Sequence, residues 1–238
     1  MVYRSRIVPI PGGKVEEGCR TMTESSRHSI DYYLPYVLPF LLTAAVIYLG
    51  PMTDLSKAVL YPLQTVLTAA ALACFWKSYR DEIRFTPDIT AVAAGVGVFL
   101  VWILLEGHYP LIGQSADAAD VPAPASRTPL FLAFRLAGAA IVIPLTEELF
   151  WRSFALRFME KTAFKSVPLG HFSWFSFLIV SLAFGLEHHR WLPGIIAGLV
   201  YAGLLFRTRN LFSPILSHAV TNLLLGIYVL ATGRWEFW

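Results

Sequence analysis

Long apolar runs dominate the chain and restrict its fold to membrane helices. Seven of them approach or exceed the roughly 20 residues that a helix needs to cross a hydrocarbon core of about 30 Å. The mean hydropathy of +0.57, with 56% hydrophobic and 15% charged residues, excludes an ordinary soluble domain. We therefore expect an all-α, polytopic membrane helix bundle with about seven transmembrane helices, at 33–50, 58–76, 88–105, 132–156, 171–189, 191–206 and 211–232. The run at 191–206 is the shortest and contains Pro193, so a tilted or re-entrant helix is expected there.

The basic residues give this bundle an orientation, because cytoplasmic loops collect Lys and Arg. With the N-terminus inside, the inner segments hold thirteen of the 19 Lys and Arg residues, the outer segments four and the spans two. We therefore expect a cytoplasmic N-terminus and an outer C-terminus. No basic face with interleaved aromatic residues is present, so nucleic acid is not an expected partner.

Two polar segments divide the chain. Residues 1–31 are polar, mixed in charge and without the apolar core of a signal peptide, which predicts a mobile cytoplasmic tail. Residues 107–128 are rich in Ala, Pro and Asp, as is typical of a flexible outer loop. We predict a three-span scaffold half at 32–106, with almost no interior polar groups, and a four-span catalytic half at 129–238 that holds every candidate for chemistry.

Two adjacent carboxylates interrupt the apolar run of residues 130–158. A charged side chain at the centre of a bilayer costs at least roughly 2.5–3.5 kcal/mol, so Glu147 and Glu148 indicate a functional site. Glu148 and Arg152 are four residues apart and share a helix face, whereas Glu147 points about 100° away. One glutamate is then paired and the other is available; a buried ion pair that only holds helices in register is the alternative. Pro144 removes a backbone hydrogen bond one turn earlier and predicts a kink or polar notch.

Polar groups also lie in the fifth and seventh spans. His188 ends the fifth span, and an imidazole is well suited to proton transfer near neutral pH. Interfacial solvation is the alternative, and we prefer it for His189 and Arg190. His218 and Asn222 are four residues apart on one stripe of the seventh span, so both must face the bundle interior. In the interior these two side chains would either donate hydrogen bonds to a developing oxyanion or form a structural hydrogen bond between helices.

Taken together, three motifs on successive helices resemble a known family. Glu-Glu-x-x-x-Arg, Phe-x-x-x-His and His-x-x-x-Asn, in this order, are similar to the motifs of the CAAX protease and bacteriocin-processing family of intramembrane proteases. The resemblance covers roughly residues 130–232, and the first hundred residues match only as generic spans. Length and layout also resemble the bacterial CAAX-protease-related proteins associated with exosortase systems. Ser153, after the motif arginine, departs from the glycine that is frequent in the family.

The resemblance implies hydrolysis of a peptide bond in a membrane peptide or protein, within the lipid bilayer of a bacterial inner membrane. It also implies a functional link to an exosortase system. It assigns roles to six side chains: water activation to Glu147 and His188, oxyanion binding to His218 and Asn222, and ordering of the site to Glu148 and Arg152. Residue counting opposes one of these roles, since His188 falls roughly 10 Å farther out than Glu147 and His218 at 1.5 Å per residue.

The residues leave the metal requirement and two other functions open. Glu147, His188 and His218 would ligate zinc with an open fourth position. The absence of a His-Glu-x-x-His helix and of short ligand spacing favours a mechanism without metal. A catalytically inactive scaffold or immunity-type protein of the same fold would have no need for so many ionisable groups in hydrocarbon. A proton-coupled carrier predicts repeated halves, which the sequence lacks.

Overall fold

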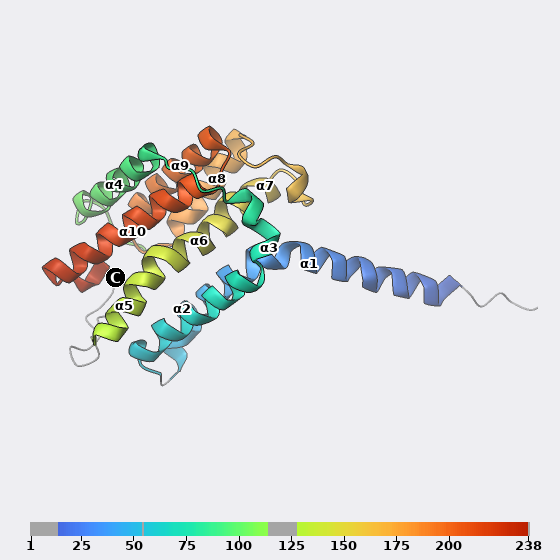
Figure 1. Ribbon diagram of the computed structural model, residues 1–238, viewed down its shortest axis with the longest axis horizontal. Coiled ribbons are helices and arrows are strands. Elements are labelled where there is room, and N and C mark those ends of the chain that lie inside the picture. Colours follow the sequence, from blue (N-terminus) through green and yellow to red (C-terminus); the bar gives the residue numbers. More distant parts are fainter. Residues whose placement is uncertain (1–13, 54, 114–127, 238) are drawn as a thin grey trace, which may run out of the picture. The chain divides into compact units, whose positions relative to one another are not determined.

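The computed structural model describes residues 14–53, 55–113 and 128–237, and all regular elements within them are helices (Figure 1). The chain divides into two units, residues 1–34 and residues 35–238. Helix α1 (Lys14–Leu49) begins inside the segment predicted as a polar tail, and residues 1–13 of that segment lie outside the described residues. Of the predicted outer loop, residues 114–127 likewise lie outside them.

Each predicted span corresponds to a helix. After α1 these are α2 (Lys57–Cys74), α4 (Ile89–Leu104), a composite helix (Pro129–Phe158), α8 (Trp174–Leu186), α9 (Trp191–Thr208) and α10 (Phe212–Thr232). Five helices are long and apolar enough to cross a membrane, whereas α4 and α8, with 16 and 13 residues, are shorter apolar helices. The prediction of an all-α membrane protein is confirmed for the described residues.

Helix α9 is long and apolar enough to cross a membrane, and its tilt stays a prediction. It is an unbroken helix of 18 residues, and Pro193 is its third residue. A proline in the first turn removes an N–H that has no partner within the helix, so it does not interrupt the helix. The short element is α8 instead, which ends at Leu186 rather than at residue 189.

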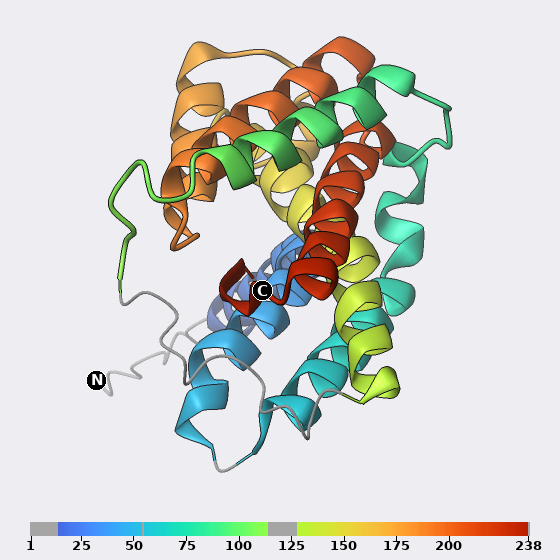
Figure 2. The ribbon, with the colours of Figure 1, turned by 90° about the vertical axis from the view of Figure 1, so that its left-hand side faces the viewer.

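Short elements connect the spans: η1 (Gly50–Met52), α3 (Trp76–Tyr79), η2 (Arg80–Glu82), η7 (Phe164–Ser166) and η8 (Trp235–Phe237). Helices α4, α9 and α10 pack against one another, and α8 packs on α9 (Figure 2). Gly198 allows the close approach of α8 and α9, because a Cβ at this position would lie 2.9 Å from the Ser181 carbonyl oxygen. The composite helix lies between this group and α2, with contacts to α2 and α10.

The composite helix contains two π-helical stretches. It comprises α5 (Pro129–Ala137), η5 (Gly138–Val142), α6 (Ile143–Glu148), η6 (Leu149–Ala155) and α7 (Leu156–Phe158). Stretch η5 ends two residues before Pro144, where the proline ring would clash with the preceding turn of a regular α-helix. The predicted disturbance at Pro144 is therefore a π-helical widening, a feature that is frequent at functional sites.

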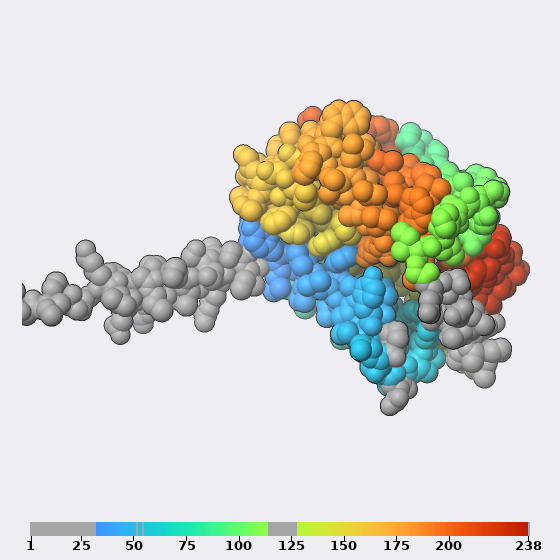
Figure 3. Space-filling model, turned by 180° about the vertical axis from the view of Figure 1, so that it is seen from behind, coloured from blue at the N-terminus to red at the C-terminus, as the bar shows by residue number. Residues whose placement is uncertain are grey.

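The two halves of the chain are joined by polar and aromatic contacts. Glu82 accepts hydrogen bonds from Arg157 Nη2 at 2.8 Å and from Ser153 Oγ, so the serine that departs from the family pattern has a partner here. The Phe40 ring of α1 stacks on Phe150 with 3.9 Å between the ring centroids. In Figure 3 the blue surface of α1 accordingly borders the yellow surface of the C-terminal part of the composite helix.

The first three spans contribute interior polar groups, contrary to the prediction. Thr43, Gln64 and Thr68 are buried, and the Thr43 and Thr68 hydroxyl oxygens lie 3.2 Å apart. The prediction was wrong because hydropathy does not show which face of a helix is buried, and these three side chains lie on buried faces. A threonine on a helix also bonds to the carbonyl one turn earlier, as Thr43 does to Pro39 at 3.2 Å.

Candidate functional site

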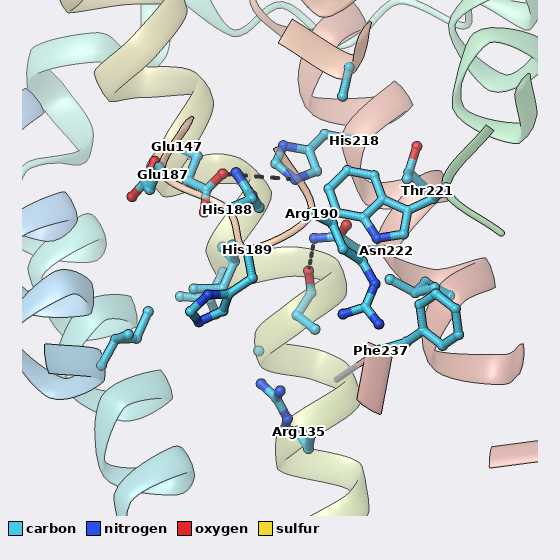
Figure 4. A pocket seen from close by; sticks show the side chains of 18 of the residues that line it. Arg135, Glu147, Glu187, His188, His189, Arg190, His218, Thr221, Asn222 and Phe237 are labelled. Atoms are coloured by element: carbon cyan, nitrogen blue, oxygen red, sulfur yellow. Dashed lines mark hydrogen bonds and ion pairs between the residues drawn. The ribbon is translucent and has the colours of Figure 1, made fainter. Parts of the chain in front are cut away.

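A cavity of about 440 Å³ lies inside the unit of residues 35–238 (Figure 4). Four of the six predicted site residues line it: Glu147, His188, His218 and Asn222. They come from the composite helix, from the turn after α8 and from α10. The other two predicted residues, Glu148 and Arg152, are buried directly behind the cavity wall. The three motifs therefore meet at one place.

The predicted pair of Glu148 and Arg152 is confirmed. Arg152 Nε lies 3.1 Å from Glu148 Oε2, and the two side chains are 1% and 0% exposed. The guanidinium carbon of Arg152 also lies 4.1 Å from the centroid of the Phe184 ring. Its Nη2 donates to the Gly198 carbonyl oxygen at 3.4 Å. The arginine therefore links the composite helix to α8 and α9 and fixes the Glu148 carboxylate.

His218 is held by the same pair. Its Nδ1 lies 2.9 Å from Glu148 Oε1, and its ring stacks on Tyr201 with 4.9 Å between centroids. Because a carboxylate only accepts, the Nδ1–H of His218 donates to Glu148. This bond directs Nε2 toward Glu147, whose Oε2 is 4.0 Å away. The contact between His218 and Glu148 joins residues 70 positions apart and was not expected from the sequence.

Glu147 has the opposite environment to its neighbour. Its side chain is buried, yet no hydrogen-bond partner of Oε2 exists among the described residues. The 4.0 Å to His218 Nε2 is too long for a direct hydrogen bond. Since Glu147 also lines the cavity, its carboxylate is the one available to a water or a substrate.

Asn222 is positioned by the π-helical stretch η5. In a regular α-helix the Ile143 N–H would donate to the Ala139 carbonyl oxygen, but here it donates to Gly138. Pro144 has no N–H to offer in its place. Asn222 Nδ2 donates to the Ala139 oxygen at 2.9 Å and so satisfies it. The proline, the widened turn and the asparagine therefore form one unit, and the amide keeps a second N–H for another acceptor.

His188 lies on the cavity wall despite the depth expected from residue counting. The estimate was wrong because α8 ends at Leu186, and His188 belongs to the turn that leads into α9. Its Nδ1–H donates to the Phe184 carbonyl oxygen at 2.8 Å, and its ring contacts Trp102 with 5.7 Å between centroids. The neutral imidazole therefore carries its lone pair on Nε2.

Three cavity residues were missed or misjudged from the sequence. Glu187 lines the cavity as an electrostatic neighbour of Glu147 and accepts a hydrogen bond from Trp151 Nε1 at 3.1 Å (Figure 4). Its place in a Glu-His-His sequence was the available signal. His189 and Arg190, assigned to interfacial solvation, also line the cavity. Arg190 binds Glu106 through two hydrogen bonds of 2.7 and 2.8 Å.

The donor arrangement does not match a zinc site. In the part of the chain that the structure describes, no three His, Cys, Asp or Glu side chains are placed to hold one metal ion. A catalytic zinc is bound by three protein ligands.

Comparison with protein families gave one match. Residues 129–224 match the model of the family described as type II CAAX prenyl endopeptidase Rce1-like. The matched segment contains the three motifs, so the resemblance seen in the sequence is confirmed for this part of the chain. Comparisons with curated proteins and with solved structures gave no match. The apolar helices and this membrane-protease family together describe an integral membrane protein.

Proposed function

We propose that this chain, which carries an Rce1-like CAAX endopeptidase segment at 129–224, is an intramembrane endopeptidase that uses a water molecule as its nucleophile. The observation that carries the proposal is the Glu147 carboxylate. It is buried, it lines a cavity, and its Oε2 lacks a hydrogen-bond partner among the described residues. A carboxylate held in this way is a good proton acceptor for a bound water.

In the proposed reaction Glu147 accepts a proton from the water while the water oxygen attacks the carbonyl carbon of the scissile bond. His188 Nε2 orients this water. The C=O double bond becomes a tetrahedral oxyanion. When it collapses, the C–N bond breaks, and Glu147 returns the proton to the leaving amine. The products are a new carboxylate end and a new amine end.

His218 and Asn222 stabilise the oxyanion in this scheme. The scheme uses His218 as the imidazolium, whose Nδ1–H donates to Glu148 Oε1 at 2.9 Å and whose Nε2–H donates to the oxyanion. Asn222 supplies the N–H that Ala139 does not use. The 4.0 Å between Glu147 Oε2 and His218 Nε2 suits a water on the first atom and a carbonyl oxygen on the second. The water oxygen is then next to the carbon of the same carbonyl group whose oxygen His218 binds.

The proposed reaction needs no metal ion. The arrangement of the described residues supports this, because no three of their His, Cys, Asp or Glu side chains are placed to hold one metal ion. Purified enzyme should therefore keep its activity after exhaustive chelation, and elemental analysis should find far less than one zinc per chain. Stoichiometric zinc whose removal and return track activity would contradict the proposal.

The substrate is a membrane-associated peptide or protein. Comparing the membrane peptidome of cells that carry the wild type with that of cells that carry Glu147→Gln tests the activity on all membrane peptides at once. We expect cleavage products that occur with the wild type alone. Identical peptidomes, with both proteins at equal levels, would favour the inactive scaffold. The location in a bacterial inner membrane and the link to an exosortase system remain predictions.

A further inference from the structure

A second cavity, of about 360 Å³, lies within the unit of residues 35–238 and shares no lining residue with the first. It is lined by residues of the connection that leads into α4 (84–88) and by residues at the junction of α9 and α10 (207–213). The distribution of Lys and Arg predicts that both segments lie on the cytoplasmic side of the membrane. The proposed reaction uses none of these residues.

Asn210 fixes the two segments to each other. Its side chain is buried, and its Oδ1 accepts hydrogen bonds from the backbone N–H groups of Arg84 at 3.0 Å and Phe212 at 3.1 Å. Its Nδ2 donates to the Arg84 carbonyl oxygen at 2.6 Å. Both backbone groups of Arg84 are therefore held, although Arg84 and Asn210 are 126 positions apart. The side chain of Arg84 consequently starts from a fixed point beside the cavity.

The carboxylate of this cavity is already neutralised. Asp88 Oδ1 accepts hydrogen bonds from the Thr90 N–H at 3.0 Å and from the Thr90 hydroxyl at 2.6 Å. Its Oδ2 accepts from Arg207 Nη2 at 2.7 Å and from the Ser213 hydroxyl at 3.0 Å. Because Arg207 balances Asp88, the charge left over in the lining is that of Arg84.

The two arginines have N–H groups to offer to an anion. Among the described residues, Arg84 forms no ion pair, and its side chain is exposed. The hydrogen bonds of Arg207 to Asp88 and Thr90 both use Nη2, so its other two nitrogens have unused donors. Guanidinium groups match the oxygen atoms of phosphate groups in both charge and geometry. The net positive charge of the lining therefore favours a phosphate-bearing ligand.

Large apolar side chains lie next to this charged cavity. Phe85 and Ile89 are 80% and 79% exposed, and the Phe85 ring contacts Phe212 with 5.0 Å between centroids. Ile89 is also the first residue of the apolar helix α4. At the end of a membrane helix such side chains are covered by lipid acyl chains, whereas arginines lie at the level of the headgroups. The cavity thus lies where a headgroup and its acyl chains meet.

We propose that this cavity binds the phosphate group of an anionic phospholipid, with Arg84 and Arg207 as donors and with Phe85 and Ile89 against the acyl chains. Basic pockets between membrane helices on the cytoplasmic side bind anionic headgroups, and the volume is within the roughly 300–1,000 Å³ of small-molecule sites. The bound lipid links α4 to the junction of α9 and α10. This site is independent of the proposed peptidase function.

The test follows the unfolding temperature of the purified chain in neutral detergent during titration with three ligands. These are short-chain phosphatidylglycerol, short-chain phosphatidylcholine and inorganic phosphate. A ligand that binds only the folded state stabilises it, so we expect a saturable rise with phosphatidylglycerol. The zwitterionic lipid and free phosphate should bind at least about tenfold more weakly, because each lacks one of the two features that the site recognises. Equal affinity for the two lipids, or for phosphate and phosphatidylglycerol, would overturn the proposal.

Arg84→Gln should weaken the binding of phosphatidylglycerol by roughly 10- to 100-fold, the range for a lost hydrogen bond to a charged group. The variant should fold, because Asn210 bonds to the backbone of Arg84 and not to its side chain. Arg84→Lys keeps the charge but loses the planar fork, and its affinity should lie between those of wild type and Arg84→Gln.

The matched control is Arg80→Gln. Arg80 is an exposed cation four residues earlier, on the same predicted side of the membrane, and it does not line the cavity. This variant should bind phosphatidylglycerol as wild type does. Wild-type affinity in a folded Arg84→Gln protein would overturn the proposal. An equal loss in Arg80→Gln would do the same, because it would show a general attraction of the basic surface to anionic lipid. The comparison of the three ligands on wild type decides the matter whichever variant folds.

Discussion

At the scale of single residues, two adjacent glutamates differ in what surrounds them. Glu148 is fixed by Arg152 at 3.1 Å and by His218 at 2.9 Å, whereas Glu147 lines the cavity and its Oε2 has no hydrogen-bond partner among the described residues. The side-chain positions follow from the helix, on which neighbours point about 100° apart. One carboxylate therefore holds the site together and its neighbour remains available for proton transfer.

Glu148→Gln should destabilise the protein as well as reduce activity. The change leaves the buried Arg152 charge without its partner, which costs about 3–5 kcal/mol. Thermal unfolding in detergent measures the loss, and the double variant Glu148→Gln with Arg152→Met should recover part of it while remaining inactive. A single variant as stable as wild type would show that the pair contributes nothing to the fold.

The sequence predicted local relationships between residues and missed distant ones. Glu148 and Arg152 are four residues apart on one helix, so their pairing follows from helix geometry. The bond between His218 and Glu148 depends on how α10 packs against α6, which hydropathy and spacing do not encode. The role of Glu187 depends likewise on the Trp151 indole, which comes from another helix.

At the scale of elements, the composite helix determines the geometry of the site. Pro144 and stretch η5 expose the Ala139 oxygen that Asn222 binds, and η6 carries Arg152. The spans themselves were predictable, because an apolar run of sufficient length has few alternatives in lipid. The π-helical stretch η5 was not, since the Ala139 oxygen that it exposes is satisfied by a side chain from α10.

Pro144→Ala should therefore lower activity without lowering stability. The new N–H can donate to a carbonyl one turn earlier, so η5 is expected to become regular α-helix and to rotate Glu147 relative to His218. We expect kcat to fall at least about tenfold while the unfolding temperature stays equal or rises, since a proline inside a helix costs about 3 kcal/mol.

The matched control is Pro193→Ala, because Pro193 lies in the first turn of α9, where its missing N–H has no helical partner. This variant should retain wild-type kcat. Equal kcat for wild type and Pro144→Ala would show that the widened turn is not needed for the reaction.

At the scale of the whole molecule, both halves of the chain form the cavity. The scaffold assigned to residues 32–106 supplies Gln64, Thr65 and Trp102 to the wall, although the family match begins only at residue 129. The sequence did not indicate this, because uncharged polar groups in α2 leave the apolar run intact. Substrate recognition is therefore expected to depend on α2 as well as on the matched segment.

The distribution of Lys and Arg predicts the orientation of the molecule. Thirteen of the 19 basic residues fall on the side of the N-terminus. A reporter that is active only outside the cytoplasm should therefore be active when fused after Trp238 and inactive when fused before Met1. The reverse pattern would place the N-terminus outside and turn the cavity toward the opposite face of the membrane.

The most direct test of the central claim is the turnover of Glu147→Gln on a substrate found in the peptidome comparison. The substitution keeps the volume of the side chain and removes its ability to accept a proton. We predict a kcat at least about 1,000-fold below wild type, because general-base catalysis contributes roughly 10²–10⁴-fold and the water would also lose its ligand. Expression and unfolding temperature should be unchanged. A folded Glu147→Gln enzyme with wild-type kcat would contradict the account.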